Sequence, residues 1–365
     1  MNSFKLFPLL FIFSFLAACA QPSKPVENVF LVTFDGLRWQ EVFHGADSSL
    51  ISDKNYTQNP KSLMDKFWDE DNLRRRELLL PFFWNVLAAE GQLYGNRLYE
   101  NHVNCTNTLW FSYPGYSEIL CGFSDDETIH SNDKIPNPNV TVLEFLNKQK
   151  GFKNKVAAFG SWDVFPYIIN EERSGIPVNA GFEDFVGKNI SGEVKMLNKL
   201  QKEIRSPWET VRLDAFTHNF MMEYVKEQKP RVVYISYGET DDFAHDGHYD
   251  EYLKSAKQTD AFISELWNYI QSDDTYRNKT ALLITTDHGR GTDPKDTWRS
   301  HGKSIENAGE IWLAAIGPDI KALGEVKVPG QSYQNQIATT ICNLLGVDYI
   351  SEKAAGKAIE TIMVK

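Results

Sequence analysis

Short runs of apolar and β-branched residues recur along the chain, and segments with a helical period separate them. Runs this short and this uniformly apolar are typical of strands that are buried on both faces in a parallel sheet. The runs cover residues 29–34, 156–159, 231–237, 281–286 and 311–316. Apolar positions repeat at helical spacing over residues 78–90, 214–226, 249–271 and 334–345. This alternation predicts an α/β fold, with a doubly wound, mostly parallel sheet covered by helices on both faces.

Two segments interrupt this alternation without a clear period of their own. Residues 45–76 are polar with scattered aromatic side chains, and residues 161–206 show little repeat. Both are too long for simple connections in a compact domain, so we expect inserted cap segments over the strand ends. Residues 28–350 are therefore predicted to form one domain with its caps, followed by a C-terminal tail at residues 351–365.

The first residues have the pattern of an export signal rather than of the fold. A positively charged start precedes an apolar run at residues 6–16, which is short for a membrane span. Leu16-Ala17-Ala18-Cys19 then resembles a bacterial lipobox. We expect residues 1–18 to be a lipoprotein signal peptide, Cys19 to be the lipidated first residue, and residues 19–27 to be a tether. The alternative is an ordinary secretory signal in which Cys19 is incidental.

Export and composition both limit the range of partners. A lipid-anchored chain would lie in the bacterial cell envelope, at the periplasmic or the cell surface. The formal net charge of −11 disfavours nucleic-acid backbones as partners. A negative protein still accepts a small anionic substrate where cations such as metal ions reverse the field at the site. Cys105 and Cys121 either form a disulfide in this compartment or, like Cys342, stay as buried thiols.

Acidic and imidazole side chains gather where the apolar runs end. In open α/β sheets, ligands bind beyond the carboxyl ends of the strands, so we expect these side chains to meet. They are Asp35, Asp241, His245, Asp287 and His288, with His301 a short distance further on. Taken alone, Asp35 could equally be a helix N-cap. Asp242 and His248 compete with Asp241 and His245, but only Asp241 and His245 are an acid and an imidazole four residues apart.

The chemistry of these groups indicates metal ions. Three carboxylates with three imidazoles suit zinc or a similar cation better than calcium or magnesium, which prefer oxygen ligands alone. Six protein ligands are too many for one tetrahedral ion and about right for two. Two zinc ions roughly 4 Å apart can hold both oxygens of an in-line displacement, and such a reaction still needs a nucleophile.

The order of these groups resembles that of the alkaline phosphatase superfamily over about residues 28–345. The chain is most similar to the nucleotide pyrophosphatase/phosphodiesterase branch, whose first motif resembles Phe34-Asp35-Gly36-Leu37-Arg38-Trp39. Ser112, in Phe111-Ser112-Tyr113-Pro114-Gly115, is similar to the nucleophile turn of that branch. The acids and imidazoles at 241–245, 287–288 and 301 then follow in the family's order.

The resemblance implies a role for each matching residue. The two implied ligand sets are Asp35, Ser112, Asp287 and His288 for one zinc ion, and Asp241, His245 and His301 for the other. Ser112 would be the nucleophile that forms a covalent phospho-enzyme, and Asn132 would contact a phosphate oxygen. Arg38 is a candidate phosphate contact, with a surface salt bridge as the alternative. Tyr113 is a candidate for stacking on a base or aryl group, with core packing as the alternative. The implied function is extracytoplasmic hydrolysis of small phosphoric esters.

Two departures from the family pattern keep the substrate class open. The phosphodiesterase branch carries Thr where this chain has Ser112, which is closer to the alkaline phosphatases, so diesters, pyrophosphates and monoesters all remain candidates. Sulfatases carry a related Ser-x-Pro-x-Arg signal for formylglycine formation, but Tyr116 stands at the Arg position, so this conversion is not expected. A sulfatase on the same fold is the alternative enzyme. A non-catalytic lipoprotein binding module is less favoured, because the chain keeps all six ligands and the nucleophile.

Overall fold

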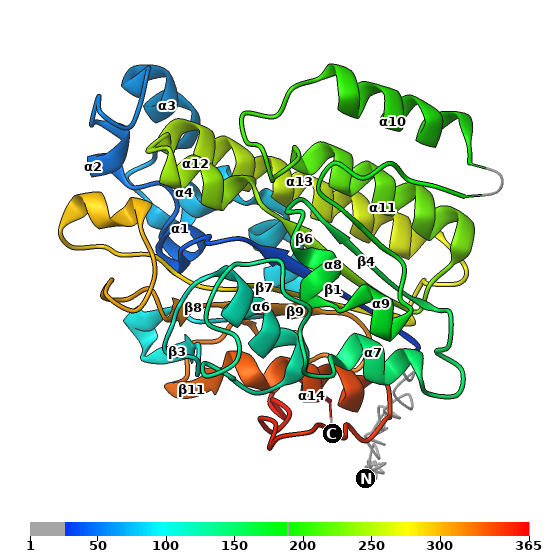
Figure 1. Cartoon of the computed structure of the whole chain (residues 1–365). Helices are drawn as coiled ribbons and strands as arrows, with labels where there is room; N and C mark the ends of the chain where they lie inside the picture. Colours follow the sequence, from blue (N-terminus) through cyan, green and yellow to red (C-terminus); the bar gives the residue numbers. More distant parts are fainter. Residues whose placement is uncertain (1–25, 188–189, 365) are drawn as a thin grey trace, which may run out of the picture.

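A computed structural model of the chain describes residues 26–187 and 190–364. Its centre is an eight-stranded sheet with the spatial order β10-β2-β9-β7-β1-β6-β4-β5 (Figure 1). Neighbouring strands are parallel, except that β9 runs against both of its neighbours. The strands are β1 (Asn28–Phe34), β2 (Gly91–Tyr94), β4 (Val156–Gly160), β5 (Val178–Ala180), β6 (Val232–Tyr237), β7 (Thr280–Thr286), β9 (Leu313–Ile316) and β10 (Gly324–Glu325). The mostly parallel α/β sheet predicted from the sequence is confirmed.

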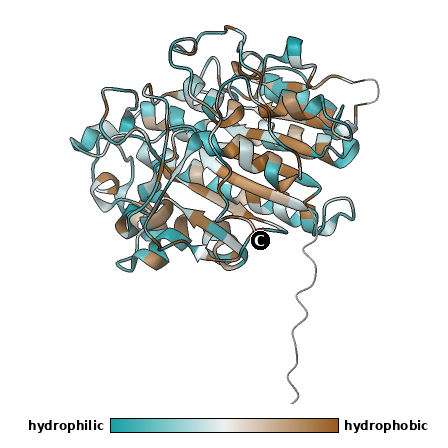
Figure 2. Cartoon of the chain, turned by 90° about the horizontal axis from the view of Figure 1, so that it is seen from below, coloured by the Kyte–Doolittle hydropathy of each residue, from teal (hydrophilic) through white to brown (hydrophobic). Residues whose placement is uncertain are grey.

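Helices cover both faces of the sheet, and each face has its own apolar core. Phe30 and Val32 of β1 belong to one core, and Val29 and Leu31 belong to the other, as burial on both faces requires. The first core is covered by α1 (Trp39–His44), α2 (Ser48–Ile51), α3 (Pro60–Phe67), α4 (Asn72–Leu79), α11 (Asp214–Gln228) and α13 (Tyr249–Ser272). The second core is covered by α6 (Ser112–Cys121), α7 (Val142–Asn147), α8 (Phe165–Ile168) and α14 (Ile337–Leu344). In Figure 2 the hydrophobic colour gathers on these inner elements, and the outer loops are mostly hydrophilic.

Three adjacent central strands end at the same level. Phe34 at the end of β1 pairs with Tyr237 of β6 on one side and with Thr286 of β7 on the other. Because the three strands are parallel, the residues that follow them emerge at one edge of the sheet. The chain then enters α12 (Glu239–His245) after β6, and a long loop with the 3-10 helix η3 (Lys295–Arg299) after β7. The predicted metal ligands apart from Ser112 lie on the segments that leave this edge.

The strand predicted at residues 311–316 is two strands in the structure. Its first part joins a separate three-stranded sheet, whereas its second part is β9 of the large sheet. The small sheet consists of β3 (Asn101–Asn104), β8 (Glu310–Ile311) and β11 (Gly330–Tyr333), and the 3-10 helices η2 (Arg97–Tyr99) and η4 (Gln334–Gln336) adjoin it. Trp312 lies between β8 and β9, fully buried, and its indole N–H donates to the Leu37 carbonyl at 2.8 Å. This anchored side chain separates the two strands, which the uniformly apolar sequence did not reveal.

The helix predicted at residues 78–90 is interrupted at Pro81. Proline lacks a backbone donor and restricts the residue before it, so α4 ends there. The chain resumes as the π-helix η1 (Phe83–Leu87) and the short helix α5 (Ala88–Glu90). The carboxylate of Asp260 on α13 accepts hydrogen bonds from the amides of Phe82 and Phe83 at 2.8 and 3.1 Å. A distant side chain thus satisfies the backbone donors that the break leaves free.

The two segments expected as caps differ in the structure. Residues 45–76 fold largely as α2, α3 and the first part of α4. Residues 161–206 instead contribute β5, which pairs in parallel with β4 at the edge of the large sheet, so this part is an edge strand rather than a cap. The same segment holds α8, α9 (Glu171–Ser174) and α10 (Gly192–Glu203), the last an amphipathic helix that the sequence pattern did not predict.

Both ends of the described chain pack against the domain. Val26 is buried and the amide of Glu27 donates to the Lys279 carbonyl at 2.8 Å, so the fold begins within the predicted tether. Ile359 and Ile362 are buried as well, which brings the predicted C-terminal tail into the domain. The predicted signal peptide and the lipobox cysteine lie outside the described residues. In the part of the chain that the structure describes, no helix combines the length and the apolarity needed to cross a membrane.

Candidate active site

The residues that directly follow β1 and β7 form a buried group, here called the inner cluster: Asp35, Asp287 and His288. The Nε2 atom of His288 lies 3.3 Å from Asp35 Oδ1 and 3.3 Å from Asp287 Oδ2. Asp287 and His288 are fully buried, and Asp35 is only 5% exposed. The register of β1 with β7 places these groups together, because both strands end at the same level.

Ser112, the predicted nucleophile, is the first residue of α6 and faces the inner cluster. Its Oγ lies 3.5 Å from His288 Nε2. The first turn of α6 packs closely on the ligand loop, since a Cβ at Gly115 would come within 2.4 Å of the Asp287 carbonyl oxygen. Glycine at this position therefore permits the contact that holds the serine beside the ligands.

The loop before Ser112 is fixed by Glu118, a buried carboxylate on α6 that the sequence analysis did not single out. Its oxygens accept hydrogen bonds from the amides of Thr106 and Asn107 at 2.7 to 3.1 Å, and from the Thr106 hydroxyl and the Asn107 side-chain amide at 2.8 Å. Burial raises the pKa of Glu118, although these hydrogen bonds oppose that rise. The turn before Ser112 is thus tied to α6.

Tyr116 connects α6 to the side chains of the inner cluster. Its hydroxyl donates to Asp35 Oδ2 at 2.8 Å and accepts from the hydroxyl of Ser236 on β6 at 3.1 Å. Tyr116 occupies the position at which sulfatases carry the Arg of their modification signal. Its position four residues after Ser112, on the same helical face, was the signal that could have assigned it to the site.

Asp241, His245 and His301 form a second group, here called the outer cluster. The Nε2 atom of His245 lies 3.2 Å from Asp241 Oδ2 and 2.9 Å from His301 Nε2, and His301 Nε2 lies 3.7 Å from Asp241 Oδ1. Two imidazole nitrogens this close share either a proton or a cation. The side chain of His245 is 46% exposed, so this cluster opens toward solvent.

Backbone carbonyls fix the orientation of two of the imidazoles. His288 Nδ1 lies 2.9 Å from the Gly289 carbonyl oxygen, and His301 Nδ1 lies 3.2 Å from that of Trp110. A carbonyl only accepts, so Nδ1 carries a proton in both rings and Nε2 is the atom that faces the clusters. Trp110 has φ +51, a conformation uncommon outside glycine, and its strained backbone aims this carbonyl.

The inner cluster has the properties of a cation site. Asp35 Oδ1 and Asp287 Oδ2 are buried and have no hydrogen-bond partner. Burial raises the pKa of Asp35 well above its usual range, and the carboxylate of Asp241 raises it further. The pKa of Asp287 is raised in the same way, by burial and then by Asp35. Unpaired carboxylate oxygens that crowd around an imidazole nitrogen fit a metal ion, which supplies the missing positive charge.

The outer cluster is electrostatically different. Burial alone would raise the pKa of Asp241, but the guanidinium of Arg290 and the imidazoles of His245 and His301 bring it well below its usual range. Burial lowers the pKa of His301 well below its usual value, and the neighbouring His288 lowers it further, so the ring is neutral as a ligand must be. The potential ligand atoms fall into two adjoining groups, one with Asp35, Asp287 and His288 and one with Asp241, His288 and His301.

The predicted substrate contacts have three different outcomes. Asn132 lies at the nucleophile turn, where its Oδ1 accepts the amide of Tyr113 at 3.0 Å. Tyr113 itself is 2% exposed, and its hydroxyl donates to the Ile135 carbonyl at 2.6 Å, so its side chain packs in the fold rather than facing a substrate. Arg38 is also 2% exposed, and it forms a buried ion pair with Glu41. Both side chains are engaged within the fold, and their assignment as substrate contacts stays a prediction without structural support.

The described cysteines form no disulfide. Cys105, Cys121 and Cys342 are all free and buried. The Sγ atom of Cys105 donates to the Asp287 carbonyl at 3.5 Å, behind the inner cluster. Burial raises the pKa of the Cys105 thiol, and the nearby carboxylates raise it further, so the thiol is neutral and packs as an apolar side chain.

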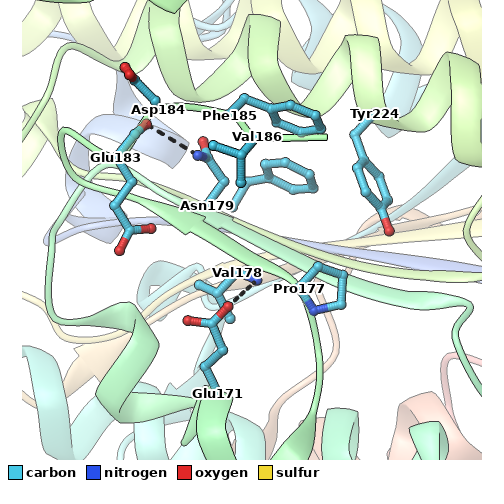
Figure 3. Close-up of a pocket in the computed structure, with 10 residues that line it drawn as sticks. Glu171, Pro177, Val178, Asn179, Glu183, Asp184, Phe185, Val186 and Tyr224 are labelled. Carbon is cyan, nitrogen blue, oxygen red and sulfur yellow. Dashed lines mark hydrogen bonds between the residues drawn. The ribbon is translucent and has the colours of Figure 1, made fainter. Parts of the chain in front are cut away.

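A cavity of about 500 Å³ lies along β5, at the far edge of the sheet from the β9 side (Figure 3). Its wall includes Phe159, Asn179, Phe185 and Tyr224. None of its lining residues belongs to the inner or the outer cluster. This cavity is therefore separate from the candidate active site.

The fold matches that of solved alkaline phosphatase-like structures, and the chain is a hydrolase of phosphoric or sulfate esters. A model of the sulfatase family matches residues 27–347. The chain belongs to the sulfatase family, and the prediction of the alkaline phosphatase superfamily from the sequence is confirmed. The comparisons do not single out the nucleotide pyrophosphatase/phosphodiesterase branch.

Several solved structures share the fold at low sequence identity. The alkaline phosphatase PafA matches with a TM-score of 0.61 and 10% identity, over 94% of this chain and 100% of that chain. A putative sulfatase from Bacteroides thetaiotaomicron matches with a TM-score of 0.59 and 13% identity, over 93% and 74%. The lipoteichoic acid synthase LtaP from Listeria monocytogenes matches with 0.51 and 12%, over 89% and 73%. No curated protein matches the chain.

Proposed function

We propose that the protein hydrolyses small phosphoric esters, with two zinc ions and a covalent phospho-Ser112 intermediate. The observation that carries this proposal is the pair of adjoining clusters beside Ser112, in which three carboxylates and three imidazoles converge. Mixed nitrogen and oxygen ligands suit zinc, and two clusters suit two ions. Phosphodiesters, pyrophosphates and aryl phosphates are the substrate classes to be compared.

Ser112 supplies the nucleophile of the proposed reaction. Its Oγ forms a bond to phosphorus as the bond from phosphorus to the leaving oxygen breaks, and the hydroxyl proton is transferred through solvent to the leaving oxygen. Zinc, when bound, supplies the positive charge that favours ionisation of the serine hydroxyl and offsets the charge on the phosphoryl oxygens. Asp35, Asp287 and His288 would hold one ion beside Ser112. Water then hydrolyses the phosphoserine and restores the hydroxyl.

Other residues of the chain orient these groups. Tyr116 holds Asp35 through its hydroxyl, and the carbonyl of Trp110 holds His301. The side-chain oxygen of Asn132 accepts the Tyr113 amide. Its amide nitrogen is proposed to donate to a phosphoryl oxygen. Positioning of this kind is the main contribution that a protein makes to phosphoryl transfer.

Phosphoric esters are favoured over sulfate esters by two features. The sulfatase modification signal requires an Arg where this chain has Tyr116, and the hydroxyl of Tyr116 is engaged with Asp35. Ser112 is therefore proposed to act as an unmodified hydroxyl. The paired imidazoles of the outer cluster also suit zinc better than calcium, which prefers oxygen ligands alone.

A panel of ester substrates tests the proposed function. Purified protein is assayed on aryl phosphate monoesters, aryl phosphate diesters and aryl sulfates, with its metal content measured by elemental analysis. We expect phosphate-ester turnover and about two zinc equivalents per chain. We also expect a chelator to abolish turnover and zinc to restore it. Sulfate-ester turnover by a protein that holds one calcium ion and no zinc would contradict the proposal and establish the sulfatase alternative.

We also propose that the mature chain is anchored by lipid at Cys19 in the bacterial cell envelope. The support is the lipobox pattern at residues 16–19, directly after a short apolar run. Native protein should partition into the detergent phase, and Cys19→Ser should release it or leave it unprocessed. Unchanged membrane attachment of the variant would contradict lipid anchoring and assign the attachment to the apolar run itself.

A further inference from the structure

Arg290 lies two residues after His288, and its buried guanidinium makes hydrogen bonds to three separate segments. It is 1% exposed. Its Nε donates to the Gly36 carbonyl at 3.0 Å, its Nη1 to the Arg299 carbonyl at 2.8 Å, and its Nη2 to the Asp241 carbonyl at 3.1 Å. The Nη2 group also forms an ion pair with the Asp241 carboxylate.

Each segment that Arg290 contacts carries a predicted metal ligand. Gly36 directly follows Asp35, and Arg299 stands two residues before His301. Asp241 is itself a ligand of the outer cluster, and its carboxylate is the one that the guanidinium pairs with. The guanidinium of Arg290, on the loop after β7, therefore joins the turn after β1, helix α12 and the end of η3. A guanidinium is a planar fork with five donors in a fixed geometry.

Gly36 provides the space that this arrangement needs. A Cβ at this position would lie 2.9 Å from Arg290 Nε, 2.9 Å from Arg290 Nη2 and 2.9 Å from Asp241 Oδ1. Its φ of +59 is also one that side-chain-bearing residues rarely adopt. Gly36 is thus required for two reasons. Its positive φ forms the turn after β1, and its lack of a Cβ leaves room for the guanidinium of Arg290 and the carboxylate of Asp241.

We propose that Arg290 is a positioning residue for the second metal ion, which holds Asp241 and the backbone before His301 in register with the inner cluster. The proposal rests on the two-metal function proposed above. The inner ligands follow directly on paired strands, so the sheet already fixes them. The outer ligands lie on α12 and on the loop after η3, outside the sheet, and depend on cross-links between loops. Arg290 makes several of these cross-links at once.

Zinc binding by metal-free protein tests this proposal independently of turnover. The protein is titrated with Zn²⁺ against a competing chelator, and His245→Ala identifies which binding step belongs to the outer cluster. Arg290→Lys keeps the positive charge but cannot reach all the acceptors of the planar fork. We expect it to weaken the outer step about 10- to 100-fold, the usual effect of removing a partner of a metal ligand, and to leave the inner step within about threefold.

A matched control separates positioning from a general loss of stability. Arg212 is another fully buried guanidinium, bonded to Thr217 and Asn179 and to none of the segments that carry ligands. Arg212→Lys should lower the thermal midpoint to a similar degree and leave both zinc steps unchanged. Equal weakening of both steps in Arg290→Lys, or no change in either, would overturn the role of Arg290.

A second pair of variants tests the same contact without altering Arg290. Gly36→Ala crowds the guanidinium, whereas Gly175→Ala imposes a similar backbone strain at φ +63, where a Cβ meets nothing within 4 Å. Only Gly36→Ala should weaken the outer zinc step. If native protein binds no second zinc equivalent at all, the proposed two-metal function fails. If native protein binds both and these variants change neither step, only the inference about Arg290 fails.

Discussion

The inner and outer clusters contain the same kinds of ligand but are held in different ways. The inner residues follow directly on β1 and β7, and their exposure is 5% or less. The outer residues lie on α12 and on the loop after η3, where the side chain of His245 is 46% exposed. The inner geometry is a consequence of strand register, whereas the outer geometry is a consequence of side-chain to backbone hydrogen bonds. We therefore expect the geometry of the inner cluster to tolerate single substitutions better than the geometry of the outer cluster, which depends on individual side chains.

The charge balance of the two clusters differs as well. In the inner cluster, Asp35 and Asp287 have buried carboxylate oxygens without a hydrogen-bond partner. Burial raises both pKa values well above the usual range, with a further rise from Asp241 for Asp35 and from Asp35 for Asp287. In the outer cluster, the single carboxylate of Asp241 is paired with Arg290. Without metal, the inner cluster is strained by like charges, and the outer cluster is neutralised by the protein itself.

The largest expected effect is that of Ser112→Ala, which removes the proposed nucleophile and leaves the residues of both clusters unchanged. The substitution removes the hydroxyl and keeps the start of α6, so both zinc ions should still bind. Loss of a nucleophile costs roughly 10⁴- to 10⁶-fold in turnover, which steady-state assays on an aryl phosphate measure. Ser112→Thr should be milder, because Thr retains the hydroxyl. Near-normal rates in zinc-loaded Ser112→Ala would show that water, and not Ser112, attacks the ester.

Amide substitutions in the two clusters should shift the stability of the metal-free protein in opposite directions. Asp241→Asn leaves the buried guanidinium of Arg290 without its charged partner, which typically costs about 3–5 kcal/mol. Asp287→Asn removes a like-charge neighbour of Asp35 and keeps an oxygen that can accept from the Gly36 amide, so it should stabilise the protein by about 1 kcal/mol or more. Denaturant unfolding after chelation measures both changes. Equal destabilisation by the two variants would contradict the difference in charge balance.

Tyr116→Phe is expected to have the smallest of these effects, and it tests whether the Tyr116 hydroxyl supports the inner cluster through Asp35. The variant removes the hydroxyl that donates to Asp35 Oδ2 and keeps the packing of the ring against Phe165. Loss of a hydrogen bond to a metal ligand should weaken the inner zinc about 10-fold and leave the outer zinc unchanged. Competition with a chelator measures the two affinities. An effect on the outer zinc alone would show that Tyr116 does not act through Asp35.

The sheet, and the gathering of acids and imidazoles at its strand ends, were predictable because their signals are local, whereas the division of these residues into two sets came from the resemblance to a family. Each ligand of the inner cluster stands at the end of an uninterrupted apolar run, and parallel strands bring such ends together. The break at Pro81 and the split at Trp312 escaped prediction because distant partners, the Asp260 carboxylate and the Leu37 carbonyl, stabilise them. Helical and strand periods carry no information about such contacts.

The residues that support the two clusters were harder to predict than the cluster residues themselves. Tyr116 and Asp35 are 81 positions apart, and Arg290 and Asp241 are 49 positions apart, so no spacing connects them. Arg38 was assigned to the substrate because it stands near a ligand in the sequence. The structure shows that its side chain turns back to Glu41 in the core. Proximity along the chain does not determine the direction of a side chain.

The covalent intermediate on Ser112 is the most direct test of the central claim. Zinc-loaded protein is mixed with an aryl phosphate, quenched in acid while turnover continues, and digested for mass spectrometry, with Ser112→Ala as the control. The account predicts that the peptide containing Ser112 gains the mass of one phosphoryl group and that the control peptide gains nothing. Active protein whose Ser112 peptide is never phosphorylated at any quench time, or is found as formylglycine, would contradict a phosphoserine mechanism.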